Sequence, residues 1–201
     1  MAQPVKHSPD AMLDAARDLI LEGGPAAASA RAVSLALGAP SGSIYHRFPR
    51  RDDLVAATWL RAQDRFLDAY LGALSGEDPL QAAVAAADTV LAWSLANSSD
   101  AALLLRHALR DLLHAEASPA LHAKAQANQD RLSHALTELA AALDRPMADV
   151  TLAAVDLPYA VTRRVLRSHA PAEPARASLR RAVDLLLAAP PAQTGLVAAP
   201  E

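Results

Sequence analysis

The sequence predicts an all-α protein of about nine helices. Ala and Leu dominate its 201 residues, 52% of the residues are hydrophobic and only 3% are aromatic, so residues that favour helices outnumber those that favour strands. Apolar residues recur at helical spacing along successive segments, and Gly, Pro, Asn and Ser residues separate these segments. Since no segment shows a competing strand pattern, we expect helices throughout.

The first helix is predicted over residues 9–22. Ser8 can cap its amino end with a hydroxyl, Pro9 suits the first turn, and Asp10 lies near the positive end of the helix dipole. Apolar residues then recur on one side of the helix, opposite a stripe of acidic residues. A Gly-Gly-Pro run directly after residue 22 ends the helix.

Two short helices follow, and their spacing is typical of a helix-turn-helix. The second helix is predicted to begin at Ser29, whose hydroxyl can cap it, and to end at Gly38. Pro40 fits the first turn of a third helix, and Pro49 restricts that helix to about residue 48. Such a short helix buries little, but it carries side chains that can donate hydrogen bonds to phosphate oxygens and base edges. These are Ser41, Ser43, Tyr45, His46 and Arg47.

The remaining chain is predicted to form one long helix and five further helices. The long helix begins near Arg51, with two acids in its first turn, and extends to about residue 74. Capping or helix-breaking residues separate the later segments. The five segments are 79–96, 99–115, 119–143, 147–168 and 173–189. Residues 190–201 show no pattern, and we expect a disordered tail there.

The formal net charge of the whole chain is −3, which by itself neither supports nor excludes a nucleic-acid partner. The charges of the amino-terminal segment have to be counted separately. Residues 1–54 contain six Lys or Arg and six Asp or Glu, which gives 6 − 6 = 0. Four of the acids form the stripe on the first helix, whereas most of the arginines cluster around the second and third helices and the start of the fourth. A domain polarised in this way can bind phosphate through one face.

The chain contains no cysteine, which excludes disulfides and thiolate metal sites and is compatible with a reducing compartment. Its polar amino terminus does not resemble a signal peptide, and no apolar run reaches the roughly 18 residues that a membrane helix needs. We therefore expect a cytoplasmic protein that does not enter a membrane.

The segment from Pro9 to Leu60 resembles the amino-terminal domain of the TetR (tetracycline repressor) family of bacterial transcription regulators. In that family a Thr or Ser opens the second helix, and a Gly-Thr/Ser-Leu/Ile-Tyr run in the third helix precedes a Phe, a Lys and a Leu. The corresponding residues here are Ser29, Val33, Gly42, Ser43, Ile44, Tyr45, Phe48, Arg51 and Leu54.

Four positions depart from the family's pattern. Ser34 and Leu37 replace small Ala residues, Pro40 stands where a Ser often caps the third helix, and Arg51 replaces Lys. Arg51 keeps the positive charge. Leu37 enlarges a side chain where the second and third helices approach closely, so it bears on the angle between them.

The resemblance implies a helix-turn-helix DNA-binding domain at residues 1–54 and a helical domain for ligand binding and dimerisation at residues 55–189. It implies a ligand-responsive transcriptional regulator, a repressor, that binds a palindromic double-stranded DNA operator as a homodimer. The third helix would enter the major groove, where its glycine lets the backbone approach DNA closely. The residues implied in DNA binding are Ser29, Arg31, Ser41, Gly42, Ser43, Tyr45, His46, Arg50 and Arg51.

The same residues allow other interpretations. Tyr45 and Phe48 could be core aromatics of a small three-helix domain, and Arg50 and Arg51 could lie in an ordinary solvated turn. For Phe48 we adopt the core interpretation. The alternative for the whole chain is a DNA-blind helical ligand-binding or interaction module of the same fold, which would keep the helices and lose the phosphate contacts.

The last two predicted helices are rich in apolar residues for elements at the edge of a domain. The family's corresponding helices form a four-helix bundle between two subunits, and the resemblance therefore favours a homodimer. From periodicity alone, these residues could equally close the protomer's own core. The dimerisation candidates are Leu152, Val155, Tyr159, Leu166, Leu179, Val183, Leu186 and Leu187.

The family also encloses a pocket for a small-molecule effector in its second domain, and the identity of that effector does not transfer. Polar and aromatic residues embedded in the apolar segments are the candidates for ligand binding. They are Phe66, Tyr70, Trp93, Arg106, His107 and Asn128. Trp93 and His107 suit the task best, as a flat apolar wall and a hydrogen-bonding group. The alternative is that each is a satisfied core residue.

An enzyme is the competing class of function. The sequence has no His-Glu-x-x-His motif, no Gly-rich phosphate loop and no serine elbow, and its seven histidines are scattered. Asp88 and Glu116 are expected on solvated helix faces. We therefore expect no catalytic residues, no metal site and no cofactor.

Overall fold

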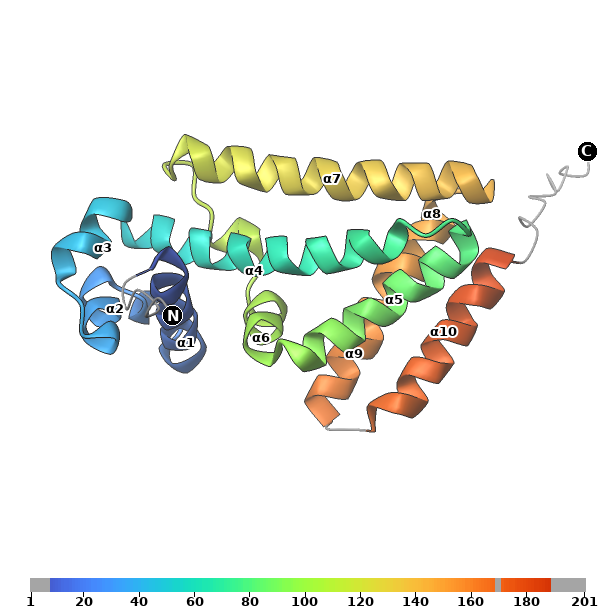
Figure 1. Cartoon of the computed structure of the whole chain (residues 1–201), viewed down its shortest axis with the longest axis horizontal. Coiled ribbons are helices and arrows are strands. Elements are labelled where there is room, and N and C mark those ends of the chain that lie inside the picture. Colours follow the sequence, from blue (N-terminus) through green and yellow to red (C-terminus); the bar gives the residue numbers. More distant parts are fainter. Residues whose placement is uncertain (1–7, 169–170, 189–201) are drawn as a thin grey trace, which may run out of the picture. The chain divides into compact units, whose positions relative to one another are not determined.

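The computed structural model describes residues 8–168 and 171–188 (Figure 1). Within these ranges the regular structure is entirely helical, which confirms the predicted all-α class. The described part contains nine continuous helices, because residues 147–168 form a single one. The predicted tail at residues 190–201 lies outside the described residues. None of the described helices is long and apolar enough to cross a bilayer.

The chain divides into two compact units, of which the first covers residues up to 70 and residues 92–133. The first unit contains the amino-terminal helices, most of the long helix α4, and four elements or parts of elements from further along the chain. Its elements are α1 (Pro9–Gly23), η1 (Pro25–Ala27), α2 (Ala30–Leu37), α3 (Ser41–Arg47), α4 (Arg51–Leu74) as far as residue 70, α5 (Pro79–Ala96) from residue 92, α6 (Ser98–Arg106), η2 (Leu109–Asp111) and the first part of α7 (Pro119–Leu143).

The second unit covers residues 71–91 and the chain from residue 134 onward. Its elements are most of α5 (Pro79–Ala96), the end of α7, α8 (Met147–Thr151), η3 (Leu152–Asp156), α9 (Leu157–Ser168) and α10 (Ala172–Ala188). These units are defined by contacts, whereas the predicted domains were defined by function. The domain boundary at residue 54 therefore stays a prediction.

The predicted caps of the first two helices are present, although α1 ends one residue later than predicted, at Gly23, and Pro40 precedes α3 instead of lying in its first turn. The hydroxyl of Ser8 accepts a hydrogen bond from the Ala11 amide at 3.1 Å, and the hydroxyl of Ser29 accepts one from the Ala32 amide at 3.1 Å. Gly38 ends α2 in the left-handed conformation, with φ 61°. The bounds of α5, α7 and the helix over residues 147–168 coincide with those predicted.

One predicted helix is wrong in its second half. The pattern predicts a helix over residues 99–115, but α6 ends at Arg106 and the chain becomes extended at His107. The indole N–H of Trp59 donates a 2.8 Å hydrogen bond to the His107 carbonyl, which is thereby removed from the helix ladder. The following turn buries Leu112 in the core of the first unit. Tertiary packing has overridden a local preference for helix here.

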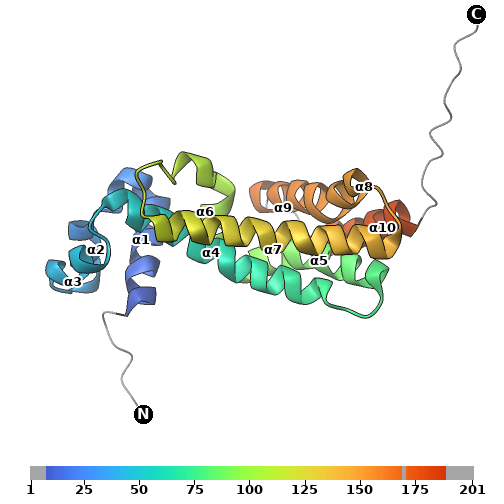
Figure 2. The ribbon, with the colours of Figure 1, turned by 90° about the horizontal axis from the view of Figure 1, so that it is seen from above.

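The amino-terminal helices share one hydrophobic core with α6 and the start of α7. Ile20 of α1, Val33 of α2 and Ile44 of α3 are fully buried in this core, as is Leu103 of α6, and Leu121 of α7 packs against it. Figures 1 and 2 show α3 beside α2, with which it is in contact. The short α3 thus contributes its buried side to a core that several other helices share.

In the second unit, Asp88 of α5 joins two arginines of α10. Arg176 donates to both carboxylate oxygens of Asp88, at 2.9 and 2.6 Å, and Arg180 donates at 2.7 Å. The expectation that Asp88 lies on a solvated face is wrong, because its side chain is buried and paired. Burial alone would raise the pKa of this carboxyl, but the hydrogen bonds from Arg176 and Arg180 outweigh burial, so the pKa is lowered.

We expect the unfolding free energy to fall in acid partly because of Asp88. A carboxyl whose pKa is lower in the folded state stabilises the fold above its unfolded pKa and loses that effect as pH falls through the folded value. The stability difference between the wild type and Asp88→Asn should therefore be largest above about pH 5 and shrink toward about pH 2. Urea unfolding at a series of pH values measures this, and a difference independent of pH would contradict it.

Candidate nucleic-acid interface

Helix α3 has one buried side and one exposed side. Ile44 is 0% exposed and inserts into the core of the first unit, while Phe48, directly after the helix, packs against the same core. The three residues that follow Ile44 on α3 are exposed, namely Tyr45, His46 and Arg47, and Tyr45 exposes 53% of its surface. The polar side chains predicted to contact DNA are therefore available on the surface, whereas the structure places Phe48 partly in the core, as interpreted from the sequence.

The start of α3 also faces open space. Gly42 and Ser43 are exposed, and a Cβ built on Gly42 would meet no atom within 4 Å. Packing within the protein therefore does not require a glycine at this position. The hydroxyl of Ser43 donates a 2.8 Å hydrogen bond to the Pro40 carbonyl. The side chain of Ser41 lies outside the described part of the structure.

Three of the residues that depart from the family's pattern lie at or near the turn between α2 and α3. The hydroxyl of Ser34 donates to the Ala39 carbonyl, so it links α2 to the residues that precede α3. Leu37 is half-buried and packs against the core of the first unit. Pro40 precedes α3 with φ −62° and offers no side-chain cap, so the backbone of the turn begins the helix without one.

The candidate phosphate-binding residues differ in how free they are. Arg31 is exposed on α2, and Ser29 still has its hydroxyl hydrogen to donate because the cap uses only the oxygen. Arg51 pairs with Asp52 at 3.1 Å, and both side chains are exposed, so this pair is weak and easily exchanged for a phosphate. Arg50 donates to the Glu116 carbonyl and is thus already engaged with the segment before α7.

A buried carboxylate strengthens the connection between the start of α4 and the segment before α7. From the sequence it was expected only as an acid in the first turn of the long helix. Asp53, in the first turn of α4, accepts a 3.1 Å hydrogen bond from the Ser118 amide, and it is only 8% exposed. Together with Arg50, it fixes the loop before α7 to the start of α4. The first turn of α4 directly follows α3, so this loop helps to position the exposed face of α3.

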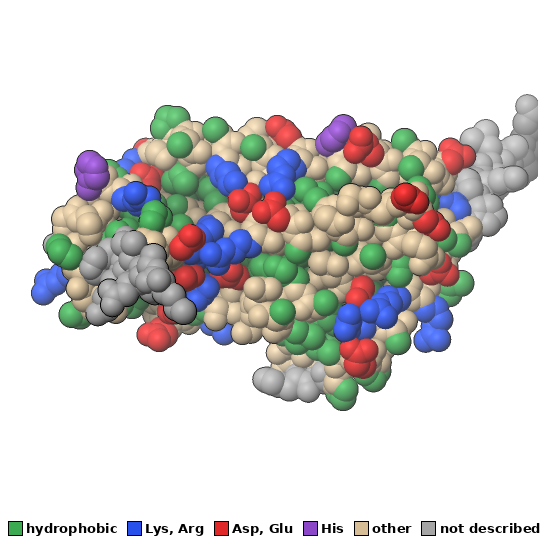
Figure 3. Space-filling view, viewed as in Figure 1, with side chains coloured by type: hydrophobic (Ala, Val, Ile, Leu, Met, Phe, Trp, Pro, Cys, Tyr) green, Lys and Arg blue, Asp and Glu red, His purple; other side chains and the backbone are tan. Residues whose placement is uncertain are grey.

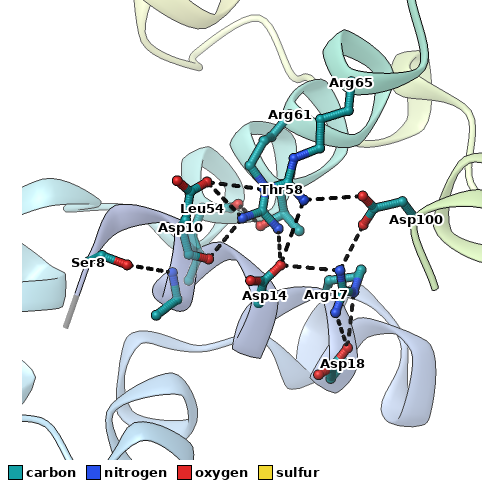
Figure 4. A network of polar contacts seen from close by, with 11 residues as sticks. Ser8, Asp10, Asp14, Arg17, Asp18, Leu54, Thr58, Arg61, Arg65 and Asp100 are labelled. Atoms are coloured by element: carbon teal, nitrogen blue, oxygen red, sulfur yellow. Dashed lines mark hydrogen bonds and ion pairs between the residues drawn. The ribbon is translucent and has the colours of Figure 1, made fainter. Parts of the chain in front are cut away.

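The acidic stripe of α1 is not a free solvated surface, because it faces arginines of α4 (Figure 4). Arg61 contacts Asp10 at 3.1 Å and Asp14 at 2.6 Å, and Arg65 contacts Asp10 at 3.3 Å. The acids are four residues apart on α1 and the arginines four apart on α4, so each pair shares one helix face. This common spacing was the feature of the sequence that could have predicted the contact.

The same network extends to α6. Asp100, whose side chain is 5% exposed, pairs with Arg17 of α1 at 2.8 Å and with Arg65 of α4 at 3.3 Å. Burial lowers the pKa of the Arg17 guanidinium, but its hydrogen bonds to Asp100 and Asp18 outweigh burial, so the net shift is upward. The network joins α1, α4 and α6 through paired charges rather than through apolar packing alone.

These ion pairs use most of the acids in a domain of zero net charge. Four of its acids are paired with arginines, namely Asp10, Asp14, Asp18 and Asp52, and two of these arginines, Arg61 and Arg65, lie beyond residue 54 on α4. The exposed Arg31 and Arg47 have no such partner among the described residues. In Figure 3, acidic and basic side chains are interspersed over the visible face rather than gathered into one field of a single sign. The exposed arginines on α2 and α3 are therefore the charges relevant to phosphate binding.

Of the six ligand-binding candidates, the structure brings three aromatic residues together. The ring of Phe66 lies 5.8 Å from that of Tyr70 and 5.3 Å from that of Trp93, the latter in an edge-to-face arrangement. Tyr70 is buried, which raises the pKa of its hydroxyl well above the ordinary value. These residues form an aromatic cluster of α4 and α5 within the first unit.

Asn128 of α7 is buried and only partly satisfied. Its amide nitrogen donates a 3.1 Å hydrogen bond to Gln63 of α4, whereas its oxygen has no hydrogen-bond partner among the described residues. Sequence reasoning missed Gln63, which lies three residues before Phe66 and seven before Tyr70, on the same helix face. A buried amide oxygen without a partner is available to a hydrogen-bond donor.

The two remaining candidates have other contacts. Arg106 is exposed and donates a 3.2 Å hydrogen bond to the Leu21 carbonyl, which attaches α6 to α1. His107 is half-buried, and its carbonyl accepts the hydrogen bond from Trp59. No described contact joins either residue to the aromatic cluster.

The dimerisation candidates fall into two groups. Leu179, Val183 and Leu187 of α10 are buried within the second unit, where they already cover apolar surface of the protomer. Leu152 and Leu186 are exposed, as is Tyr159, while Val155 and Leu166 are half-buried. The exposed members lie on η3, α9 and α10.

Comparisons with known proteins bear on the helix-turn-helix and on the fold. Residues 12–58 match the sequence model of the family described as bacterial regulatory proteins, tetR family. A TetR-like transcriptional regulator from Rhodococcus sp. RHA1 is 24% identical with a TM-score of 0.67, and the alignment covers 94% of this chain and 100% of that chain. No curated protein matches the sequence significantly.

Two further solved structures have the same fold. The TetR family transcriptional regulator PfmR from Thermus thermophilus is 23% identical with a TM-score of 0.62, over 90% of this chain and 96% of that chain. The fatty acid degradation regulator FadR from Bacillus halodurans is 18% identical with a TM-score of 0.65, over 90% of this chain and 97% of that chain. At these identities the likeness establishes the fold.

The buried and exposed sides of α3, placed after the capped α2, define a helix-turn-helix DNA-binding domain. The match over residues 12–58 shows that this domain is that of the tetR family. The chain thus has a DNA-binding domain that matches the tetR family at residues 12–58, and it has the fold of solved TetR-like regulators.

Gly42 provides a test that separates DNA contact from folding. Because a Cβ at this position meets nothing within the protein, Gly42→Ala should leave the unfolding free energy unchanged or raise it by up to about 1 kcal/mol. If the DNA backbone approaches here, the added methyl group should weaken DNA binding at least about tenfold. Urea unfolding and DNA titration measure the two effects. Unchanged DNA affinity would show that no close approach occurs at this glycine.

Proposed function

We propose that this protein is a ligand-responsive transcriptional repressor that binds a palindromic operator as a homodimer in the cytoplasm. The observation that carries the proposal is the exposed polar side of α3, held on a buried Ile44, inside the segment that matches the tetR family. Two α3 helices would enter successive major grooves about 34–36 Å apart on one side of the duplex.

Each DNA-binding candidate has a role that suits its surroundings. Tyr45, His46 and Ser43 extend from the exposed side of α3 and would reach base edges and phosphates, and we propose the same for Ser41. Arg31, Arg51 and Ser29 would bind phosphates beside the groove, and the open space at Gly42 admits the DNA backbone. Arg50 would contribute its remaining N–H groups while it holds the loop before α7.

The effector site that the contacts favour is the aromatic cluster of Phe66, Tyr70 and Trp93, with Asn128 as its polar group. The aromatic faces would bind an apolar part of the molecule, and the Asn128 oxygen would accept a hydrogen bond from it. An effector that binds more tightly to a state unable to dock on DNA would release the operator. We keep Arg106 and His107 as candidates that would act from the junction of α6 with α1 and α4.

Selection of bound sequences from a random duplex library, at near-physiological salt, tests the proposal directly. We expect an inverted-repeat consensus that is bound by a dimer with strongly salt-dependent affinity, because phosphate contacts release counterions. A purified protein that enriches no sequence and binds no duplex would overturn the proposal and favour the DNA-blind module. The selected operator then provides the probe for effector screening.

Arg51→Ala and Tyr45→Ala should weaken operator binding while the dimer stays intact. Because a homodimer loses the contact in both protomers, Arg51→Ala should reduce the slope of log affinity against log salt by about 2, which is about 1 for each phosphate contact. Arg110→Ala is the matched control, because Arg110 is highly exposed on η2, away from α3 in sequence, and pairs only loosely with Asp111. Tyr45→Phe separates the contribution of the hydroxyl from that of the ring.

Fluorescence anisotropy over a salt series measures affinity and slope, and sedimentation velocity measures the dimer. Equal operator affinity in the wild type, Arg51→Ala and Tyr45→Ala would contradict the DNA contacts that we assign to α3 and the start of α4. A loss of the same size in Arg110→Ala would show a general effect of charge.

A further inference from the structure

The centre of the exposed side of α3 is occupied by Gly42 and His46. The helix is regular over Ser41–Arg47, so the directions of its side chains follow from their numbers. Ile44 is fully buried and points into the core of the first unit. Because each residue of an α-helix advances the side-chain direction by about 100°, Gly42 and His46 both lie about 160° from Ile44. They are one turn apart and nearly opposite the buried residue.

The other exposed residues of α3 lie at the flanks of this centre. Ser43 and Tyr45 are each about 100° from Ile44, on opposite sides of the helix, and Arg47 is only about 60° from it. The hydroxyl of Ser43 already donates to the Pro40 carbonyl. A helix that enters the major groove with its buried side away from DNA turns its centre toward the base edges and its flanks toward the two phosphate backbones.

The imidazole of His46 is available to a base edge at the floor of the groove. His46 is exposed, and no hydrogen bond or ion pair joins its ring to another described residue. Gly42, one turn earlier, has no side chain, and a Cβ built there would meet no atom within 4 Å. The space beside His46 is therefore open, and both ring nitrogens can face DNA.

No acid of the neighbouring elements is free to pair with His46. Helix α3 is in contact with α2, and neither helix contains Asp or Glu. Of the two acids at the start of α4, one pairs with the Arg51 guanidinium at 3.1 Å and the other accepts a hydrogen bond from the Ser118 amide at 3.1 Å. The phosphates of bound DNA would thus supply the negative charge that favours a protonated imidazole. The other charged and titratable residues from α2 to the first turn of α4 are Arg31, Tyr45, Arg47, Arg50, Arg51, Asp52 and Asp53.

We infer that His46 recognises a guanine in each half-site of the operator. The inference rests on the proposed DNA-binding function and names the base that the centre of α3 contacts. A protonated imidazole donates from both nitrogens and accepts nothing. In the major groove guanine presents two acceptors, N7 and O6, whereas adenine presents an acceptor and a donor, cytosine a donor, and thymine one acceptor beside a methyl group. Guanine is the base whose groove edge matches a side chain that only donates.

The preference for guanine should depend on pH. A neutral imidazole has one donor and one acceptor nitrogen, so it suits adenine as well as guanine. Histidine takes up its proton between about pH 8 and pH 5. The affinity for a duplex with guanine at the contacted position, relative to one with adenine there, should therefore rise as pH falls from about 8 to about 6.

Selection from a random duplex library, carried out with the wild type and with variants of α3, tests the inference. His46→Ala should lose the guanine at one position of each half-site. His46→Gln should replace it with adenine, which Gln contacts through N6 and N7. Tyr45→Phe changes a flanking residue and should keep the wild-type consensus. His134→Gln is the matched control, because it makes the same change at an exposed histidine of the second unit.

Fluorescence anisotropy with two matched duplexes measures the preference. Exchange of the guanine for adenine in both half-sites should weaken wild-type binding at least about tenfold at pH 6, and by less at pH 8. His46→Ala should bind the two duplexes within about threefold of each other at both pH values. Circular dichroism checks that every variant is folded.

The outcomes separate this inference from the proposed function. A wild-type protein that enriches no sequence and binds no duplex would overturn the proposed function, and with it the inference. A consensus without guanine in its half-sites, or one that His46→Ala and His46→Gln leave unchanged, would overturn the inference alone. Equal weakening of all sequences by His46→Ala would assign His46 to phosphates and would do the same. A pH-dependent preference that persists in His46→Gln would assign the proton to another group and overturn the role of the protonated imidazole.

Discussion

The burial of Ile44 is the constraint on which the candidate interface depends. A helix of seven residues is not stable in water by itself, because too few hydrogen bonds offset the cost of starting it. The side chain of Ile44 secures α3 to a core built from α1, α2, α6 and the start of α7. The residues beside Ile44 can therefore be polar and exposed without loss of the helix. A rigid support for an exposed polar side is what a protein surface needs to recognise DNA.

The shared core also has a consequence for the division of the chain. The first compact unit includes α6 and the loop before α7, which are remote in sequence from α3. Hydrogen bonds from Arg50 to Glu116 and from Ser118 to Asp53 reinforce the apolar contacts at the start of α4. The orientation of α3 is thus sensitive to segments well outside the matched helix-turn-helix. The aromatic cluster belongs to this same unit, and its Phe66 follows Arg65 of the ion-pair network on α4.

The helices could be predicted because local residues determine most of their ends. Tertiary contacts determine the features that could not be predicted. Caps at Ser8, Ser29 and Gly38 operate within a few residues, so they could be read directly, and they fix the ends of the first helices. The break after Arg106 depends on the indole of Trp59, and the burial of Asp88 depends on arginines of α10. No residue near Arg106 or Asp88 in the sequence indicates these distant partners. The polar side of α3 was predicted because Pro40 and Pro49 limit the helix to a short length and most of its side chains can donate hydrogen bonds.

The π-helical segment η3 gives the helix over residues 147–168 an extra residue in one turn. In an α-helix each residue advances the side-chain direction by about 100°. One additional residue therefore changes the directions of the side chains that precede it relative to those that follow it. Leu152 and Tyr159 are seven residues apart, a spacing that would put them on one side of a regular α-helix, and the π-helical segment between them changes the angle between their directions. The π-helical segment therefore determines the rotation of one half of this helix relative to the other about the helix axis. Deletion of a single residue there would keep the helix but would turn its two halves toward different neighbours.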